Sequence, residues 1–106
     1  MRNLTPHQID IVTLSGRIVS IPPEKESARL TEGRLPQESI EFDGEVIPVN
    51  KTVYGDVYGL PPEGDEPLIV SLLLKQALPD RKDLYSPGQL VRDEKGNVVG
   101  CLGLSR

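Results

Sequence analysis

The sequence is poor in the residues on which most catalytic and metal sites depend. It holds one cysteine, Cys101, one histidine, His7, and no tryptophan among 106 residues. A single cysteine cannot close an intramolecular disulfide, and one cysteine with one histidine falls short of the roughly four ligands of a structural zinc site. Thiolate catalysis would need His7 as its base, within reach of a cysteine that lies in a strand pattern. We therefore expect a protein that is not an enzyme, with no catalytic residues, no metal and no cofactor.

Cofactor motifs and membrane segments are missing as well. Gly55 and Gly59 are not followed by the Lys-Ser/Thr pair and helix of a phosphate-binding loop, and no dinucleotide fingerprint occurs. The longest apolar stretch, residues 68–74, is interrupted by Ser71, far short of the roughly 18 residues that a membrane helix needs. No charged and apolar leader opens the chain. We expect a cytoplasmic protein that binds no membrane.

Acidic side chains modestly outnumber basic ones. Twelve basic side chains stand against sixteen acidic ones, which gives a formal net charge of -4. The field of such a molecule repels polyanions, so duplex DNA is not an expected partner. A local basic pocket remains compatible with this balance.

Turn-forming residues are abundant and point to a β-rich fold. Glycine and proline occur ten times each, well above average usage, so turns must be frequent and helices few. We expect a single domain over residues 1–106 of α+β, mainly β, class. It should hold about six to eight short antiparallel strands, arranged in hairpins, and one short helix near residues 71–78.

The strongest local signal is Asp43-Gly44, which suits the positive φ values of a two-residue hairpin turn. Ser15-Gly16 and residues 93–97 predict two further hairpins. Residues 32–36 read as a loop because a glycine and a proline lie three residues apart. The alternating segment 51–60 predicts a strand with a bulge or a close approach at Gly55.

The second half of the chain gives a helix signal. Leu68–Val70 is typical of a buried strand, and Ser71 can cap a helix that ends before Pro79. Residues 80–83 predict a charged surface turn. Ser71 is therefore either a plain N-cap or a contact for an anionic ligand at the helix start.

Six side chains are candidates for ligand binding. Each of two arginines, Arg29 and Arg92, lies in a short apolar stretch from which a guanidinium could clamp phosphate, although a surface salt bridge is the simpler reading. Tyr54 and Tyr58 share one face of a regular strand and could stack on a base, or pack over the edge of the core. The set is completed by Ser71 and His7.

Several motifs carry a resemblance to a known group of proteins. They are Asn3-Leu4-Thr5-Pro6-His7, Tyr54-Gly55-Asp56-Val57, Gly59-Leu60-Pro61, Leu68-Ile69-Val70-Ser71, and Val91-Arg92-Asp93 followed by Gly96 and Gly100. Together they resemble a family of small proteins carried by phages and prophages, to which no activity is attached. The leucines after Ser71 depart mildly from the small residues usual there. The resemblance implies a phage accessory protein, which would be located in the cytoplasm of an infected bacterial host.

This setting suggests three functions. One class of small phage proteins sequesters the nucleotide signals of bacterial immunity, and this chain is similar to it in size and expected origin. Our first hypothesis is therefore a protein that binds and sequesters such a nucleotide without altering it. A protein-binding inhibitor that uses a strand edge or an acidic surface is the alternative, and a structural phage component is the second alternative. With one phenylalanine, the core should be thin, so we expect a homo-oligomer, with a dimer as the first expectation.

Overall fold

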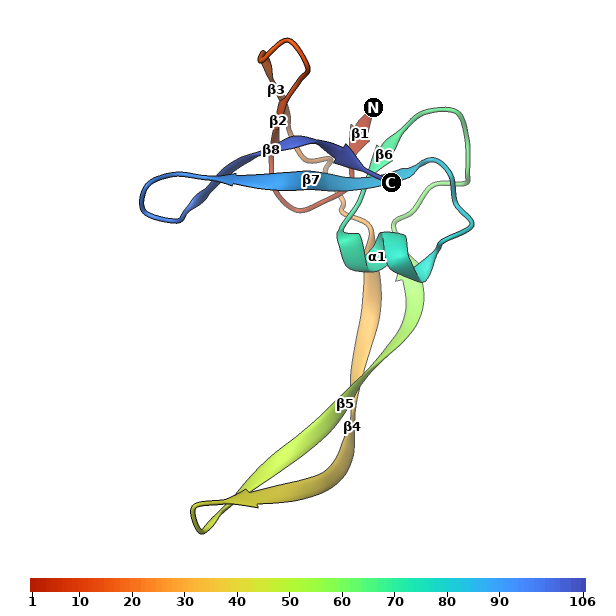
Figure 1. Cartoon of the computed structure of the whole chain (residues 1–106). Helices are drawn as coiled ribbons and strands as arrows, with labels where there is room; N and C mark the ends of the chain where they lie inside the picture. The colour runs from red at the N-terminus through yellow and green to blue at the C-terminus, as the bar shows by residue number, and fades with distance from the viewer.

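Eight strands and one helix, described over all of residues 1–106 in a computed structural model, form two sheets (Figure 1). The elements in chain order are β1 (Arg2–Asn3), β2 (Ile9–Val12), β3 (Ile18–Ile21), β4 (Arg29–Phe42), β5 (Glu45–Tyr58), β6 (Leu68–Ile69), α1 (Leu72–Ala77), β7 (Leu84–Arg92) and β8 (Val98–Ser105). The mainly β expectation is confirmed.

The larger sheet has six strands in the order β1-β6-β7-β8-β2-β3. Its pairs β2–β3 and β7–β8 are the expected antiparallel hairpins. The expectation of antiparallel strands throughout is wrong, because β1–β6, β6–β7 and β2–β8 are parallel. The chain crosses over through α1 between β6 and β7, which is the kind of connection that a parallel pair requires.

The smaller sheet is a long hairpin arm, β4–β5, that projects away from the rest of the molecule (Figure 1). Each of its strands has 14 residues, so the expectation of short strands is wrong here. The predicted loop at residues 32–36 is wrong as well, because β4 runs through it and Pro36 lies opposite Asn50. Both strands of a two-stranded arm are edge strands, where a proline without an N–H is tolerated.

The details of the arm follow the sequence signals. Asp43 and Gly44 form the turn at its tip, with φ values of 53° and 77°. The predicted close approach at Gly55 is confirmed, since a Cβ there would lie 2.5 Å from Thr31 Oγ1. The ladder shifts register at this point, between Leu30 and Glu32. A glycine therefore permits the irregularity with which the arm leaves the body.

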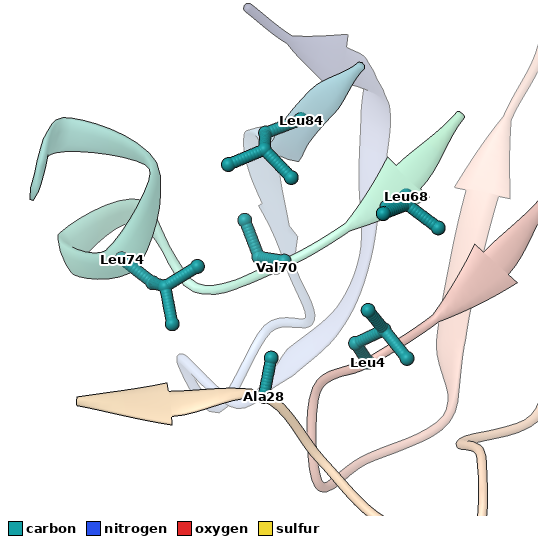
Figure 2. Packing of buried hydrophobic residues seen from close by; sticks show 6 residues of the cluster. All are labelled: Leu4, Ala28, Leu68, Val70, Leu74 and Leu84. Carbon is teal, nitrogen blue, oxygen red and sulfur yellow. The ribbon is translucent and has the colours of Figure 1, made fainter. Parts of the chain in front are cut away.

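The body has a small core centred on β6. Only 14 of the 106 residues are buried. One cluster lies between β6, α1 and the start of β4 (Figure 2) and comprises Leu4, Ala28, Leu68, Val70, Leu74 and Leu84. A second comprises Ile9, Ile11, Ile69 and Cys101. The two clusters share β6, whose adjacent residues Leu68 and Ile69 belong to different ones.

The single helix is the predicted one. Ser71 is its N-cap and its hydroxyl accepts a hydrogen bond from Leu74 N (3.2 Å). Leu74 is fully buried, and Leu78 ends the helix before Pro79. At six residues, α1 is too short to cross a membrane.

A buried asparagine joins the N-terminal segment to the sheet. Asn3 is 1% exposed, and its side-chain amide donates to the carbonyls of His7 (2.7 Å) and Ile21 (3.0 Å). Its Oδ1 accepts from the backbone N–H (3.0 Å) and hydroxyl (2.6 Å) of Thr5. The amide is thus fully used in holding the turn before β2 and the end of β3.

We predict that Asn3→Ala lowers the free energy of unfolding by roughly 3 kcal/mol, because it leaves several buried donors and acceptors without partners. Urea unfolding followed by circular dichroism measures the change. Asn50→Ala, an exposed asparagine of the arm, is the control and should alter stability by less than about 0.5 kcal/mol. Equal effects of the two substitutions would contradict a structural role for Asn3.

Candidate functional site

The structure brings two of the six candidate side chains together. Arg29 and Tyr58 are direct partners at the root of the arm, where β4 begins and β5 ends. They line one hollow of about 360 Å³ together with Lys25, Glu26, Ser27 and Gly59. We call this the root hollow.

The root hollow offers the chemistry that an anionic ring-containing ligand needs. Lys25 and Arg29 supply two cations, Tyr58 an aromatic face and Ser27 a hydroxyl. Neither cation is engaged in an ion pair, because the two ion pairs of the chain are Arg2–Glu24 and Arg81–Asp83. Glu26 is the one acidic side chain of the lining, so positive charge prevails.

The backbone at the hollow requires a glycine. Gly59 has a φ of +76°, and a Cβ there would lie 2.7 Å from the carbonyl oxygen of Ser27. Sequence reasoning missed Lys25 and Ser27, since they lie in a polar stretch that carries no periodicity. A glycine directly after Tyr58 was the only signal that the chain turns closely past another segment here.

Tyr54 does not line the root hollow. It lies opposite Glu32, and the register shift of the arm falls between it and Tyr58. The prediction of a shared face assumed a regular strand, and that assumption is wrong. Tyr54 is instead a half-exposed ring farther along the arm.

The other three candidates are apart from the root hollow and line no other hollow of the chain. Arg92 donates to the Gly96 carbonyl (2.9 Å), which closes the turn between β7 and β8. The Ser71 hydroxyl is used as the N-cap of α1. His7 is exposed, and its carbonyl accepts from Asn3.

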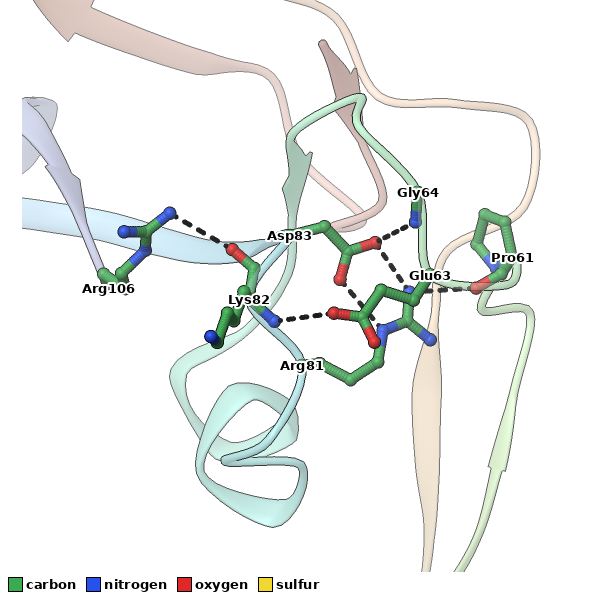
Figure 3. Close-up of polar contacts among 7 residues, drawn as sticks. All are labelled: Pro61, Glu63, Gly64, Arg81, Lys82, Asp83 and Arg106. Atoms are coloured by element: carbon green, nitrogen blue, oxygen red, sulfur yellow. Dashed lines mark hydrogen bonds and ion pairs between the residues drawn. The ribbon is translucent and has the colours of Figure 1, made fainter.

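A polar cluster joins the loop after β5 to the start of β7 (Figure 3). Arg81 donates from Nε (2.9 Å) and Nη2 (2.8 Å) to the two carboxylate oxygens of Asp83, and from Nη2 to the Pro61 carbonyl (3.0 Å). Asp83 also accepts from Gly64 N (3.3 Å). The prediction that residues 80–83 form a surface turn is wrong for Asp83, which is 6% exposed. The run of charged residues at 80–83 predicted exposure, and it gave no sign that the Asp83 carboxylate pairs with Arg81 inside the protein.

The pKa shifts of Arg81 and Asp83 agree with a structural role for this cluster. The hydrogen bonds from Arg81 lower the pKa of Asp83, and those to Asp83 raise the pKa of Arg81. Both shifts favour the charged pair. No group of three or more His, Cys, Asp or Glu side chains is close enough to hold a metal ion.

We predict that Asp83→Asn lowers the free energy of unfolding by about 2 kcal/mol at pH 7, because charged hydrogen bonds are lost. A lowered folded-state pKa stabilises the protein above the ordinary carboxyl pKa, near 4, and this contribution disappears as pH falls through the folded value. The difference between wild type and variant should therefore shrink below about pH 4. Urea titrations between pH 3 and 7 measure it, with the exposed Asp80→Asn as control.

A second surface lies on the body, beside the open edge of the larger sheet. A groove of about 620 Å³ is lined by side chains without charge: Met1, Ile11, Val12, Thr13, Leu14, Val19, Ile21, Leu102, Gly103 and Leu104. β3 is the terminal strand next to it. The groove thus combines apolar walls with a free strand edge.

No protein-family model, curated protein or solved structure matches this chain.

Proposed function

We propose that this protein binds a small nucleotide-type anion without altering it, and that the root hollow is the site. The observation that carries the proposal is the pairing of Arg29 with Tyr58 across the arm, beside Lys25. A guanidinium and an ammonium hold phosphate oxygens, and a phenol ring stacks on a base. Sequestration of a nucleotide immune signal by a phage protein is the corresponding biological role.

Binding without chemistry agrees with the content of the hollow. Its only carboxylate, Glu26, has no neighbouring carboxylate or histidine in the lining to form an acid–base pair. Hydrolysis of a phosphate ester needs an activated nucleophile or a metal in addition to cations. The residues present therefore support retention of the ligand.

The first test is a thermal-shift screen against cyclic dinucleotides, cyclic trinucleotides and cyclic ADP-ribose variants. A ligand at 100 times its dissociation constant stabilises the fold by about 2.7 kcal/mol, which raises the Tm of a domain of this size by several degrees. The ligand should be recovered unchanged after denaturation of the complex. No shift with any member, or recovery of a cleaved ligand, would contradict the proposal.

The second test locates the ligand that the screen identifies. We predict that Arg29→Ala weakens its binding by about ten- to a hundredfold, as expected for loss of a charged hydrogen bond. Arg34→Ala, on the same strand but outside the hollow, should leave the dissociation constant unchanged. Isothermal titration calorimetry measures both. Loss of affinity in Arg92→Ala with none in Arg29→Ala would move the ligand to the turn between β7 and β8.

A second candidate function rests on the body groove. An extended peptide of a host protein could add to the edge of β3 and place apolar side chains in the groove, as in β-strand addition. The exposed edge residues Ile18 and Val19 favour this reading. It corresponds to a protein-binding inhibitor.

Substitution on the edge strand tests this candidate. Val19→Lys adds a charge to the edge and to the groove wall and should abolish capture of the host protein in an affinity pull-down. Val46→Lys, on the arm, is the control and should leave capture unchanged. Capture that is unaffected by Val19→Lys would exclude the edge as the binding surface.

A further inference from the structure

The chain exposes far more surface than a compact protein of its mass. Its accessible surface is 7959 Å² at 11.6 kDa, whereas a compact monomer of that mass exposes about 5,800 Å². Its radius of gyration is 17.6 Å, against about 13 Å for a compact domain of this length. The excess of about 2,100 Å² is more than twice the roughly 800 Å² that each partner buries in a stable interface.

Much of this exposure belongs to the arm, and the arm has two unlike faces. Directly paired residues share a face and successive residues alternate. The register shift between Gln37 and Ile40 adds a residue to β4 and leaves the alternation of β5 intact. One face, which we call the apolar arm face, therefore carries six apolar side chains, Leu35, Ile40, Phe42, Ile47, Val49 and Val53, together with Gln37, Glu45 and Lys51.

The opposite face is more polar. It carries the polar side chains Glu32, Arg34, Glu41, Asn50 and Thr52, together with Pro36, Val46 and Tyr54. An amphipathic hairpin of two strands is marginally stable in water by itself, because its apolar face has nothing to pack against. The apolar arm face contacts neither core cluster of the body.

We propose that a second copy of this chain covers the apolar arm face, the two arms lying face to face and antiparallel about a twofold axis. A twofold contact uses the same surface on both copies, so one amphipathic arm is sufficient to build it. The excess exposed area of about 2,100 Å² is large enough for the roughly 800 Å² that each copy buries in a stable dimer.

The charge distribution along the arm selects the antiparallel orientation. The outer half, residues 36–50, carries four acidic side chains, Glu38, Glu41, Asp43 and Glu45, and no basic one. The inner half carries three basic side chains, Arg29, Arg34 and Lys51, and two acidic ones, Glu32 and Asp56. Parallel arms would place four acids beside four acids, whereas antiparallel arms place each acidic tip beside the partner's basic inner half.

Two charged side chains lie on the apolar arm face, Glu45 beside the tip and Lys51 near the midpoint. Lys51 pairs with Leu35 and falls close to the proposed axis. Its aliphatic stem can cover apolar surface while its ammonium group reaches solvent at the rim. Because the arm is only two strands wide, its rim lies close to the Lys51 side chain.

The association is tested by sedimentation equilibrium in buffer without nucleotides. We expect a dimer at micromolar concentration, and a dissociation constant at least tenfold weaker in the double variant Ile40→Ser/Ile47→Ser. Val46→Ser is the matched control, because Val46 neighbours Ile47 on β5 but lies on the opposite face and is 70% exposed. A monomeric wild type, or equal effects of the two variants, would overturn the proposal.

The orientation is tested separately by cysteine cross-linking, which needs no loss of stability. In the antiparallel arrangement Leu35→Cys lies near the axis and cross-links to its own copy, whereas Asp43→Cys at the tip does not. In a parallel arrangement the two tips would lie side by side, so Asp43→Cys would cross-link efficiently to its own copy. Higher salt should also weaken the antiparallel dimer and would strengthen a parallel one.

Discussion

The arrangement of the whole molecule depends on the backbone of two residues, Asn3 and Leu4. Leu4 donates to the Ile69 carbonyl and accepts from Ala28 N, both at 2.8 Å, so that it joins β6 to the residue before the arm. The Asn3 carbonyl accepts from Glu24 N (2.9 Å), and its side chain holds the end of β3. The body sheet and the root of the arm are therefore fixed to one short segment, and the direction of the arm follows from it.

The hydrogen bonds also explain several of the sequence motifs in physical terms. Asn3 and Thr5 form a buried hydrogen-bonded unit, and Ser71 caps the helix. Asp93 Oδ1 accepts from the backbone N–H groups of Lys95 and Asn97, both at 2.9 Å, within the turn that Arg92 also closes. These residues satisfy backbone groups, so their presence reports the fold. The residues of the proposed ligand site, apart from Gly59, come from segments outside those motifs.

Local signals predicted local structure well. Asp43-Gly44 could only be a tight turn, and Ser71 with Pro79 bounded the helix correctly. The length of the arm could not be predicted in this way. Gly33 and Pro36 are typical of a loop, and a proline is tolerated within a strand where that strand has a free edge. The parallel pairs and the buried charge of Asp83 depend on contacts between distant segments. For the site, the residue types Arg29 and Tyr58 were predicted, but their juxtaposition was set by a register that no periodicity encodes.

The two proposals meet at the root of the arm. Antiparallel arms bring an acidic tip of one copy toward the inner half of the other, where Lys25 and Arg29 line the root hollow. A ligand must then compete with carboxylates for these cations, and a phosphate, with more charge and more acceptor oxygens than a single carboxylate, is favoured in that exchange. The β4–β5 ladder runs from the Arg29–Tyr58 pair to the tip with two register shifts, so the proposed ligand site and the proposed dimer surface belong to one two-stranded sheet.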